Sequence, residues 1–131
     1  MKTNHKIKIY AVSTAVIVFA FSLMSLTFKI NKGEGVPEAY KNMVNPVASN
    51  ATTIAAGKVL YTKSCKMCHG VDGKGGKMAG ESDFTSAAFK ALKNGEIYYY
   101  TTEGVGKMPA YKNKIKEAND RWSIVNYLRT L

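Results

Sequence analysis

The hydrophobic pattern divides the chain into three parts. Residues 9–28 carry no charge and are mostly apolar, with lysines before and after the run. Residues 31–53 hold glycines, prolines and asparagines with almost no apolar periodicity, which predicts a flexible linker; an ordered segment wrapped around the domain is the alternative. Residues 54–131 place apolar side chains at three- and four-residue spacing and contain no alternating run long enough for a sheet. We therefore expect an all-α globular part over 54–131.

The apolar run has the length of a membrane span. Twenty residues of helix rise about 30 Å, the hydrocarbon thickness of a bilayer. We expect residues 1–30 to form an uncleaved transmembrane anchor, because the apolar core of a cleaved signal peptide is shorter and ends at small residues. The lysines before the run keep the N-terminus in the cytoplasm. A cleaved signal peptide, which would leave a soluble protein outside that membrane, is the alternative.

Four helices are predicted within the globular part. The clearest one spans 117–130, where apolar side chains recur every three or four residues. Asn94-Gly95 is interpreted as the stop between two shorter helices. Five glycines between residues 70 and 80 predict a loop. The three shorter helices span 54–65, 85–93 and 96–103.

A C-x-x-C-H motif, Cys65-Lys66-Met67-Cys68-His69, carries the chemistry. Two thiols on one helical turn can reach two vinyl groups of a haem, and the adjacent histidine then binds the iron. This pattern is an attachment signature of c-type haem. A thioredoxin-like pair would need a preceding strand, and a zinc site lacks a fourth ligand because His5 lies beyond the apolar run. A structural disulfide would leave His69 without a role.

A methionine is the expected axial ligand opposite His69. Met67 lies inside the motif, and Met78 follows the histidine closely in the glycine loop. Met108 lies one or two helices further along the chain, far enough to reach the opposite face of a haem. Pro109 follows it and stiffens the backbone there. We therefore predict His69 and Met108 as the two iron ligands, with Met78 as the alternative.

These features resemble a class I c-type cytochrome, of the small mono-haem kind that serves bacterial respiratory chains. The resemblance covers residues 54–131. It implies three to five short helices around one haem c that is covalently bound through Cys65 and Cys68. The matching pieces are Gly57, Tyr61, CKMCHG at 65–70, DGKGG at 72–76, GEIYYYTTEGVGKMPAY at 95–111 and the closing RWSIVNYLRTL.

The resemblance also implies contacts within the domain. Gly57 and Tyr61 of the first helix should meet Ile124 and Tyr127 of the last. The family often has a proline after the glycine loop, whose carbonyl accepts the histidine ring N–H. This chain has Gly80-Glu81-Ser82-Asp83 there, so a backbone carbonyl near Glu81 or Ser82 is the expected acceptor. The residues expected to pack on the haem include Ile97, Tyr98, Val105 and Trp122.

The net charge of the chain and the motifs that it lacks indicate which classes of partner it binds. The net charge is +10, and residues 54–131 alone hold 13 basic and 7 acidic side chains. A basic surface attracts acidic redox partners. Only two arginines are present, which argues against nucleic acid, and no phosphate-binding glycine motif is present. The lysines expected beside the haem edge are Lys74, Lys77, Lys107, Lys112 and Lys114.

Together these residues predict an electron carrier and not an enzyme. Two protein ligands leave no open iron position, and no histidine remains for acid–base chemistry. We expect single electrons to pass from a quinol-oxidising donor to a terminal oxidase or reductase, with no small-molecule substrate. The haem domain should lie in the periplasm, anchored to the inner membrane. A fixed haem-c subunit of a larger redox complex and a haem-based sensor are the alternatives.

Overall fold

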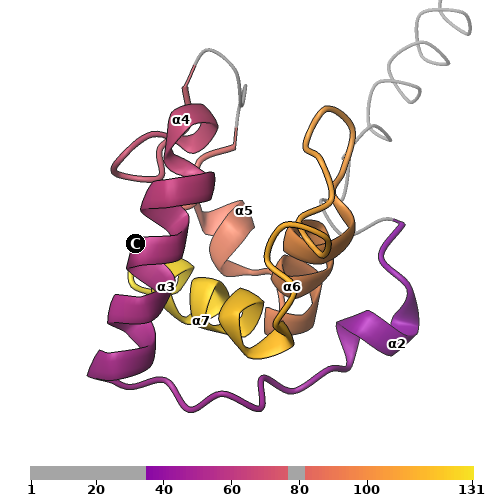
Figure 1. Cartoon of the computed structure of the whole chain (residues 1–131). Coiled ribbons are helices and arrows are strands. Elements are labelled where there is room, and N and C mark those ends of the chain that lie inside the picture. The colour runs from indigo at the N-terminus through magenta and orange to yellow at the C-terminus, as the bar shows by residue number, and fades with distance from the viewer. Residues whose placement is uncertain (1–34, 77–81) are drawn as a thin grey trace, which may run out of the picture. The chain divides into compact units, whose positions relative to one another are not determined.

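The structure, a computed structural model, describes residues 35–76 and 82–131, and helices joined by loops make up these ranges (Figure 1). Among the described residues there is no strand, and a single isolated bridge pairs Val105 with Met108. The predicted all-α class is confirmed for this part of the chain. The helices are α2 (Glu38–Lys41), α3 (Ala51–Ser64), α4 (Lys66–His69), α5 (Ala87–Lys90), α6 (Asn94–Glu103) and α7 (Ala118–Leu128).

The predicted membrane anchor, residues 1–30, lies outside the described residues. Within the two described ranges, no helix combines the length and the apolar character needed to cross a membrane. The anchor and its boundary with the linker therefore stay predictions.

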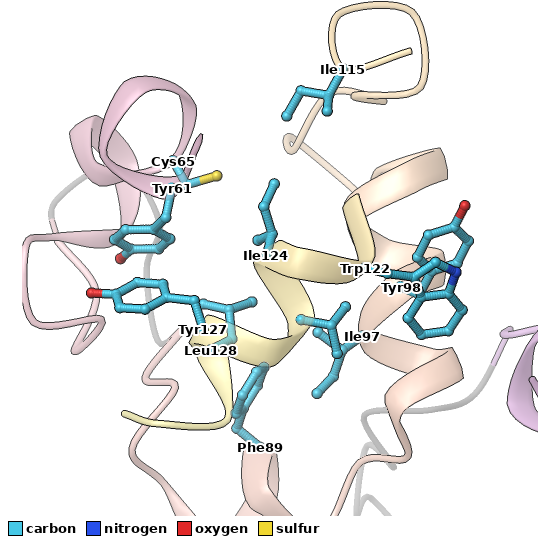
Figure 2. Close-up of a cluster of buried hydrophobic side chains, with 11 residues drawn as sticks. Tyr61, Cys65, Phe89, Ile97, Tyr98, Ile115, Trp122, Ile124, Tyr127 and Leu128 are labelled. Atoms are coloured by element: carbon cyan, nitrogen blue, oxygen red, sulfur yellow. The ribbon is translucent and has the colours of Figure 1, made fainter. Parts of the chain in front are cut away.

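Helix α7 forms the centre of the domain, with α3 and α6 packed against it (Figure 1). Every residue from Arg121 to Leu128 is buried. A helix that is buried on all sides needs hydrogen-bond partners for its polar side chains. Arg121 finds them on Thr102 and on the Tyr98 hydroxyl. In Figure 2 the apolar side chains of α7 lie among residues contributed by α3, α5 and α6.

A glycine allows α3 to cross α7 at close range. A Cβ atom on Gly57 would lie 2.0 Å from the backbone oxygen of Ser123 and 3.0 Å from the Cβ of Tyr127. One turn later, the ring of Tyr61 packs on that of Tyr127, with 5.2 Å between centroids. The expected meeting of Gly57 and Tyr61 with Tyr127 is confirmed. The closest backbone approach is to Ser123, one residue before Ile124.

Two helices begin earlier than the sequence predicted. Helix α3 starts at Ala51 because the Asn50 side chain accepts the Thr53 N–H at 3.0 Å, while Thr53 Oγ1 accepts the Asn50 N–H at 3.1 Å. This reciprocal capping stabilises the first turn. Helix α6 starts at Asn94, so the interpretation of Asn94-Gly95 as a stop is wrong. The Glu96 carboxylate accepts the Lys93 N–H at 2.7 Å and caps the helix there.

Residues 36–50, within the range predicted as a flexible linker, pack against the domain and are called the N-terminal strap below. Figure 1 shows this segment running from α2, beside α6, past α7 to the start of α3. Val36 is buried, and Asn45 Nδ2 donates to the Asn126 side-chain oxygen at 2.8 Å. Asn126 in turn donates to the Val47 carbonyl at 3.2 Å. These contacts make the strap part of the folded domain.

Candidate haem-attachment site

The C-x-x-C-H motif lies where α3 meets α4. Cys65 follows the last residue of α3 and immediately precedes α4. The backbone N–H groups of Cys68 and His69 both donate to the Cys65 carbonyl, at 3.1 and 3.0 Å. This turn sets the two cysteines one helical turn apart, as the motif predicted. In Figure 2 the Cys65 sulfur points away from α3, toward the side on which Ile115 and Ile124 lie.

The environment of Cys65 suits a neutral sulfur. No disulfide joins Cys65 and Cys68, and Cys65 is buried in the apolar cluster. Burial, with a smaller contribution from Cys68, raises the pKa of the Cys65 thiol to about 11. A reactive thioredoxin-like cysteine requires the opposite shift. Among the described residues, no group of three or more His, Cys, Asp or Glu side chains could hold zinc. A thioether bond to haem, which leaves the sulfur uncharged, fits this position.

The His69 ring is held by an aromatic contact and is buried at one nitrogen. It stacks on Phe84, with 4.7 Å between centroids and 26° between planes. Burial lowers the pKa of His69, which favours the neutral imidazole that binds metals. Its Nδ1 is buried, and none of the described residues accepts a hydrogen bond from it. Glu81, one of the two expected acceptor positions, lies outside the described residues.

The loop after His69 folds back onto the motif. The Tyr61 hydroxyl donates to the Gly70 carbonyl at 2.6 Å, and the Gly75 N–H donates to the His69 carbonyl at 3.1 Å. The Phe84 N–H donates to the Gly73 carbonyl at 2.8 Å. Phe84 is therefore fixed by the same loop that it covers. This arrangement sets the orientation of the His69 ring.

Residues 104–111, called the Met108 loop below, form a tight turn after α6. Gly104 has φ +76° and Gly106 has φ +57°, conformations that favour glycine. Val105 and Met108 exchange backbone hydrogen bonds of 3.1 and 2.9 Å. A Cβ on Gly104 would lie 2.4 Å from the Met108 oxygen. The loop thus closes on itself and carries Met108, which is half-buried.

Tyr111 connects the Met108 loop to the motif. Its hydroxyl donates to the carbonyl of Ser64 at 2.9 Å, and Ser64 immediately precedes Cys65. Burial raises the pKa of the Tyr111 phenol, so the group keeps the proton it donates. The structure therefore brings the two segments that carry the predicted ligands together. Met78 lies outside the described residues, so the choice between Met108 and Met78 stays a prediction.

Two residues that position the site were not predicted from the sequence. Phe84 and Tyr111 were not predicted, although each is an aromatic next to a ligand-bearing loop, which is a usable signal. Of the residues expected to pack on the haem, Ile97, Tyr98 and Trp122 are buried by the protein itself. Val105 is 55% exposed, and the expected packing of these four side chains on the haem stays a prediction.

One known protein family matches the part of the chain that contains this site. A family described as "Cytochrome C oxidase, cbb3-type, subunit III" matches residues 52–128. This range contains the motif, the Met108 loop and all of α4 to α7. No curated protein matches the chain.

Proposed function

The chain belongs to the cytochrome c oxidase, cbb3-type, subunit III family, and we propose that it is a membrane-anchored mono-haem cytochrome c carrying single electrons. The family match supports the class I c-type cytochrome resemblance, a haem-binding domain and the role of an electron carrier. The observation that carries the finer proposal is the contact between Tyr111 and Ser64, which joins the Met108 loop to the C-x-x-C-H motif.

In this proposal four residues hold one haem c. Cys65 and Cys68 would hold it through two thioether bonds, and His69 and Met108 would ligate its iron. When bound, the haem supplies an iron that takes up and releases one electron. The thioether of Met108 favours the reduced iron and raises the potential. Two protein ligands leave no position for a substrate on the iron, which favours electron transfer over catalysis.

The remaining residues of the site position these ligands. Phe84 fixes the plane of the His69 ring, and burial keeps that imidazole neutral. Gly104 and Tyr111 hold the Met108 loop in place. An electron carrier needs such fixed ligands, because an iron that moves little between its two oxidation states exchanges electrons with little rearrangement.

We place the haem domain in the periplasm, between a quinol-oxidising donor and a terminal oxidase or reductase. The lysines before the apolar run support this orientation. N-terminal sequencing of the purified protein tests the anchor: a chain that starts after residue 30 would mean that the segment is cleaved. The protein would then be soluble in the periplasm.

The partners we propose present acidic surfaces. Lys74 and Lys107 are exposed beside the motif and in the Met108 loop. Met67 and Val71, next to the motif residues, are 83% and 75% exposed and offer apolar contact. Positive charge around a small apolar area suits a transient complex with an acidic protein.

Ionic strength tests the charged surface. The rate of oxidation by an anionic oxidant such as ferricyanide should fall as salt is added, while the rate with a cationic cobalt complex should rise. Lys107→Gln should weaken both trends more than Lys90→Gln, which removes the same charge outside the motif and the Met108 loop. Oxidation rates that do not change with ionic strength for either reagent would contradict a basic docking surface.

A fixed subunit of an oxidase complex is the second candidate, and the family description favours it because it names an oxidase subunit. A fixed subunit stays bound to the other subunits of its complex, whereas a free electron carrier does not. A subunit should copurify with its complex through gentle detergent, whereas a shuttle should be released as a single chain.

A potentiometric titration of the full-length protein in detergent tests the proposed function. We expect one single-electron wave at a clearly positive potential, because histidine and methionine together stabilise the reduced iron. A pyridine haemochrome spectrum of the same sample should be that of a haem with two thioether bonds. A strongly negative wave would contradict Met108 ligation and indicate a low-potential dehydrogenase subunit or a sensor.

A further inference from the structure

The N-terminal strap is held against α6 by a contact that requires glycine. A Cβ atom on Gly95 would lie 1.9 Å from the Tyr40 carbonyl oxygen and 3.2 Å from that of Met43. The Tyr40 ring packs on Tyr99 at 4.9 Å and on Tyr98 at 6.3 Å. Helix α2 therefore lies directly on α6, with the Tyr40 side chain fixed between aromatic neighbours.

From this position Tyr40 reaches a carboxylate at the base of the Met108 loop. Its hydroxyl donates to Glu103 Oε1 at 3.0 Å, and the Lys112 ammonium donates to Glu103 Oε2. Glu103 ends α6 immediately before the loop, and Lys112 follows the loop immediately. The Lys112 N–H also donates to the Thr102 carbonyl at 3.2 Å. The two ends of the Met108 loop thus meet at one carboxylate, and the strap contacts that carboxylate.

The loop between these ends has its own internal bonds. Val105 and Met108 are paired through their backbones, and Gly104 packs on the Met108 carbonyl. Because these contacts lie within the turn, we expect residues 104–111 to move together when the loop is displaced. Its displacement is therefore opposed by the ion pair between Glu103 and Lys112 at its two ends and by the Tyr111 hydrogen bond to Ser64. Tyr40 holds the Glu103 carboxylate in the orientation in which Lys112 meets it.

We propose that Tyr40 and Glu103 are positioning residues that hold the ends of the Met108 loop together, so that the N-terminal strap controls how readily Met108 leaves the iron. The inference rests on the proposed ligand role of Met108. Each contact at Glu103 that is present only when the loop is in place lowers the population with Met108 displaced. The strap, which precedes the matched family region, thereby acts on the properties of the haem site.

Carbon monoxide binding to the reduced protein measures this population, because an external ligand binds only when Met108 has left. Its apparent affinity scales with the displaced fraction. In the full-length, haem-loaded protein we expect Tyr40→Phe to raise the apparent affinity about fivefold, the effect of losing one hydrogen bond. Phenylalanine keeps the ring contacts with Tyr98 and Tyr99, so the fold is preserved. The methionine-to-iron charge-transfer band of the oxidised protein should weaken in parallel.

Three further variants separate positioning from general stability. Glu103→Gln should act in the same direction as Tyr40→Phe and have the larger effect, because it also removes the charge that pairs with Lys112. Adding Tyr40→Phe to it should change little, because both changes act on the Tyr40–Glu103 hydrogen bond. Gly95→Ala should also raise the affinity by moving Tyr40 off α6, although alanine favours the helix. The matched control is Lys41→Gln, which removes an exposed ion pair with Glu38 in the same helix and should leave carbon monoxide binding unchanged.

The outcomes distinguish this inference from the ligand assignment. A methionine band that survives Met108→Ala would overturn the proposed ligand, and the positioning role with it. A wild-type band that depends on Met108, together with unchanged carbon monoxide affinity in Tyr40→Phe and Glu103→Gln, would overturn the positioning role alone.

Discussion

Replacing Met108 with alanine is expected to lower the reduction potential by on the order of 0.2 V, a fraction of the roughly 0.8 V range that axial ligands span among haem proteins. The physical reason is that the thioether stabilises the reduced iron, and alanine offers no ligand in its place. The reduced variant should also bind carbon monoxide readily, whereas the wild-type protein should bind it weakly. Optical titration and a carbon monoxide difference spectrum measure both effects.

Other methionines supply the controls. Met67 lies inside the motif and is 83% exposed, so Met67→Ala should leave the potential and carbon monoxide binding unchanged. Met78→Ala tests the alternative ligand directly. If Met78→Ala, and not Met108→Ala, lowers the potential, the ligand assignment is wrong. If the wild-type protein binds carbon monoxide as readily as Met108→Ala, the sensor alternative gains support over the electron carrier.

The parts of the site that depend on spacing along the chain could be predicted from the sequence. Cysteines three residues apart lie one turn apart when the segment is helical, and the structure shows that turn. Helix α7 could be predicted from its apolar periodicity. The close approach at Gly57 followed from the family resemblance, since a small residue is needed wherever two helices cross at short range.

The parts that depend on contacts between distant residues could not be predicted. Gly95 looks like a helix stop because glycine weakens helices. In the structure it lies within α6, since its missing side chain makes room for the Tyr40 carbonyl. The strap lacks apolar periodicity because individual contacts fix it, among them the Asn45–Asn126 hydrogen bond between residues 81 positions apart. Contacts between residues far apart in the sequence determine the structure at these positions, and the local sequence pattern does not reveal such contacts.

Replacing Gly57 with alanine is expected to destabilise the domain by about 2–3 kcal/mol, as forced overpacking does. This prediction opposes helix propensity, because alanine is up to about 1 kcal/mol more favourable than glycine inside a helix. The added Cβ would lie 2.0 Å from the Ser123 oxygen and 2.6 Å from its carbonyl carbon. Helices α3 and α7 would have to separate along their shared contact. Guanidinium unfolding, followed by far-ultraviolet circular dichroism and by haem absorbance, measures the loss.

The two atoms nearest to the added Cβ would belong to the backbone of Ser123. Because the Cβ would meet the backbone of Ser123, a second substitution such as Ser123→Gly should not restore stability. The matched control is Ala56→Gly, at an exposed neighbouring position in α3, which should cost only roughly 0.5–1 kcal/mol through helix propensity. Gly57→Ala should therefore be the more damaging of the two, although it introduces the better helix former. An unfolding midpoint at or above that of the wild type would mean that α3 and α7 do not cross at Gly57.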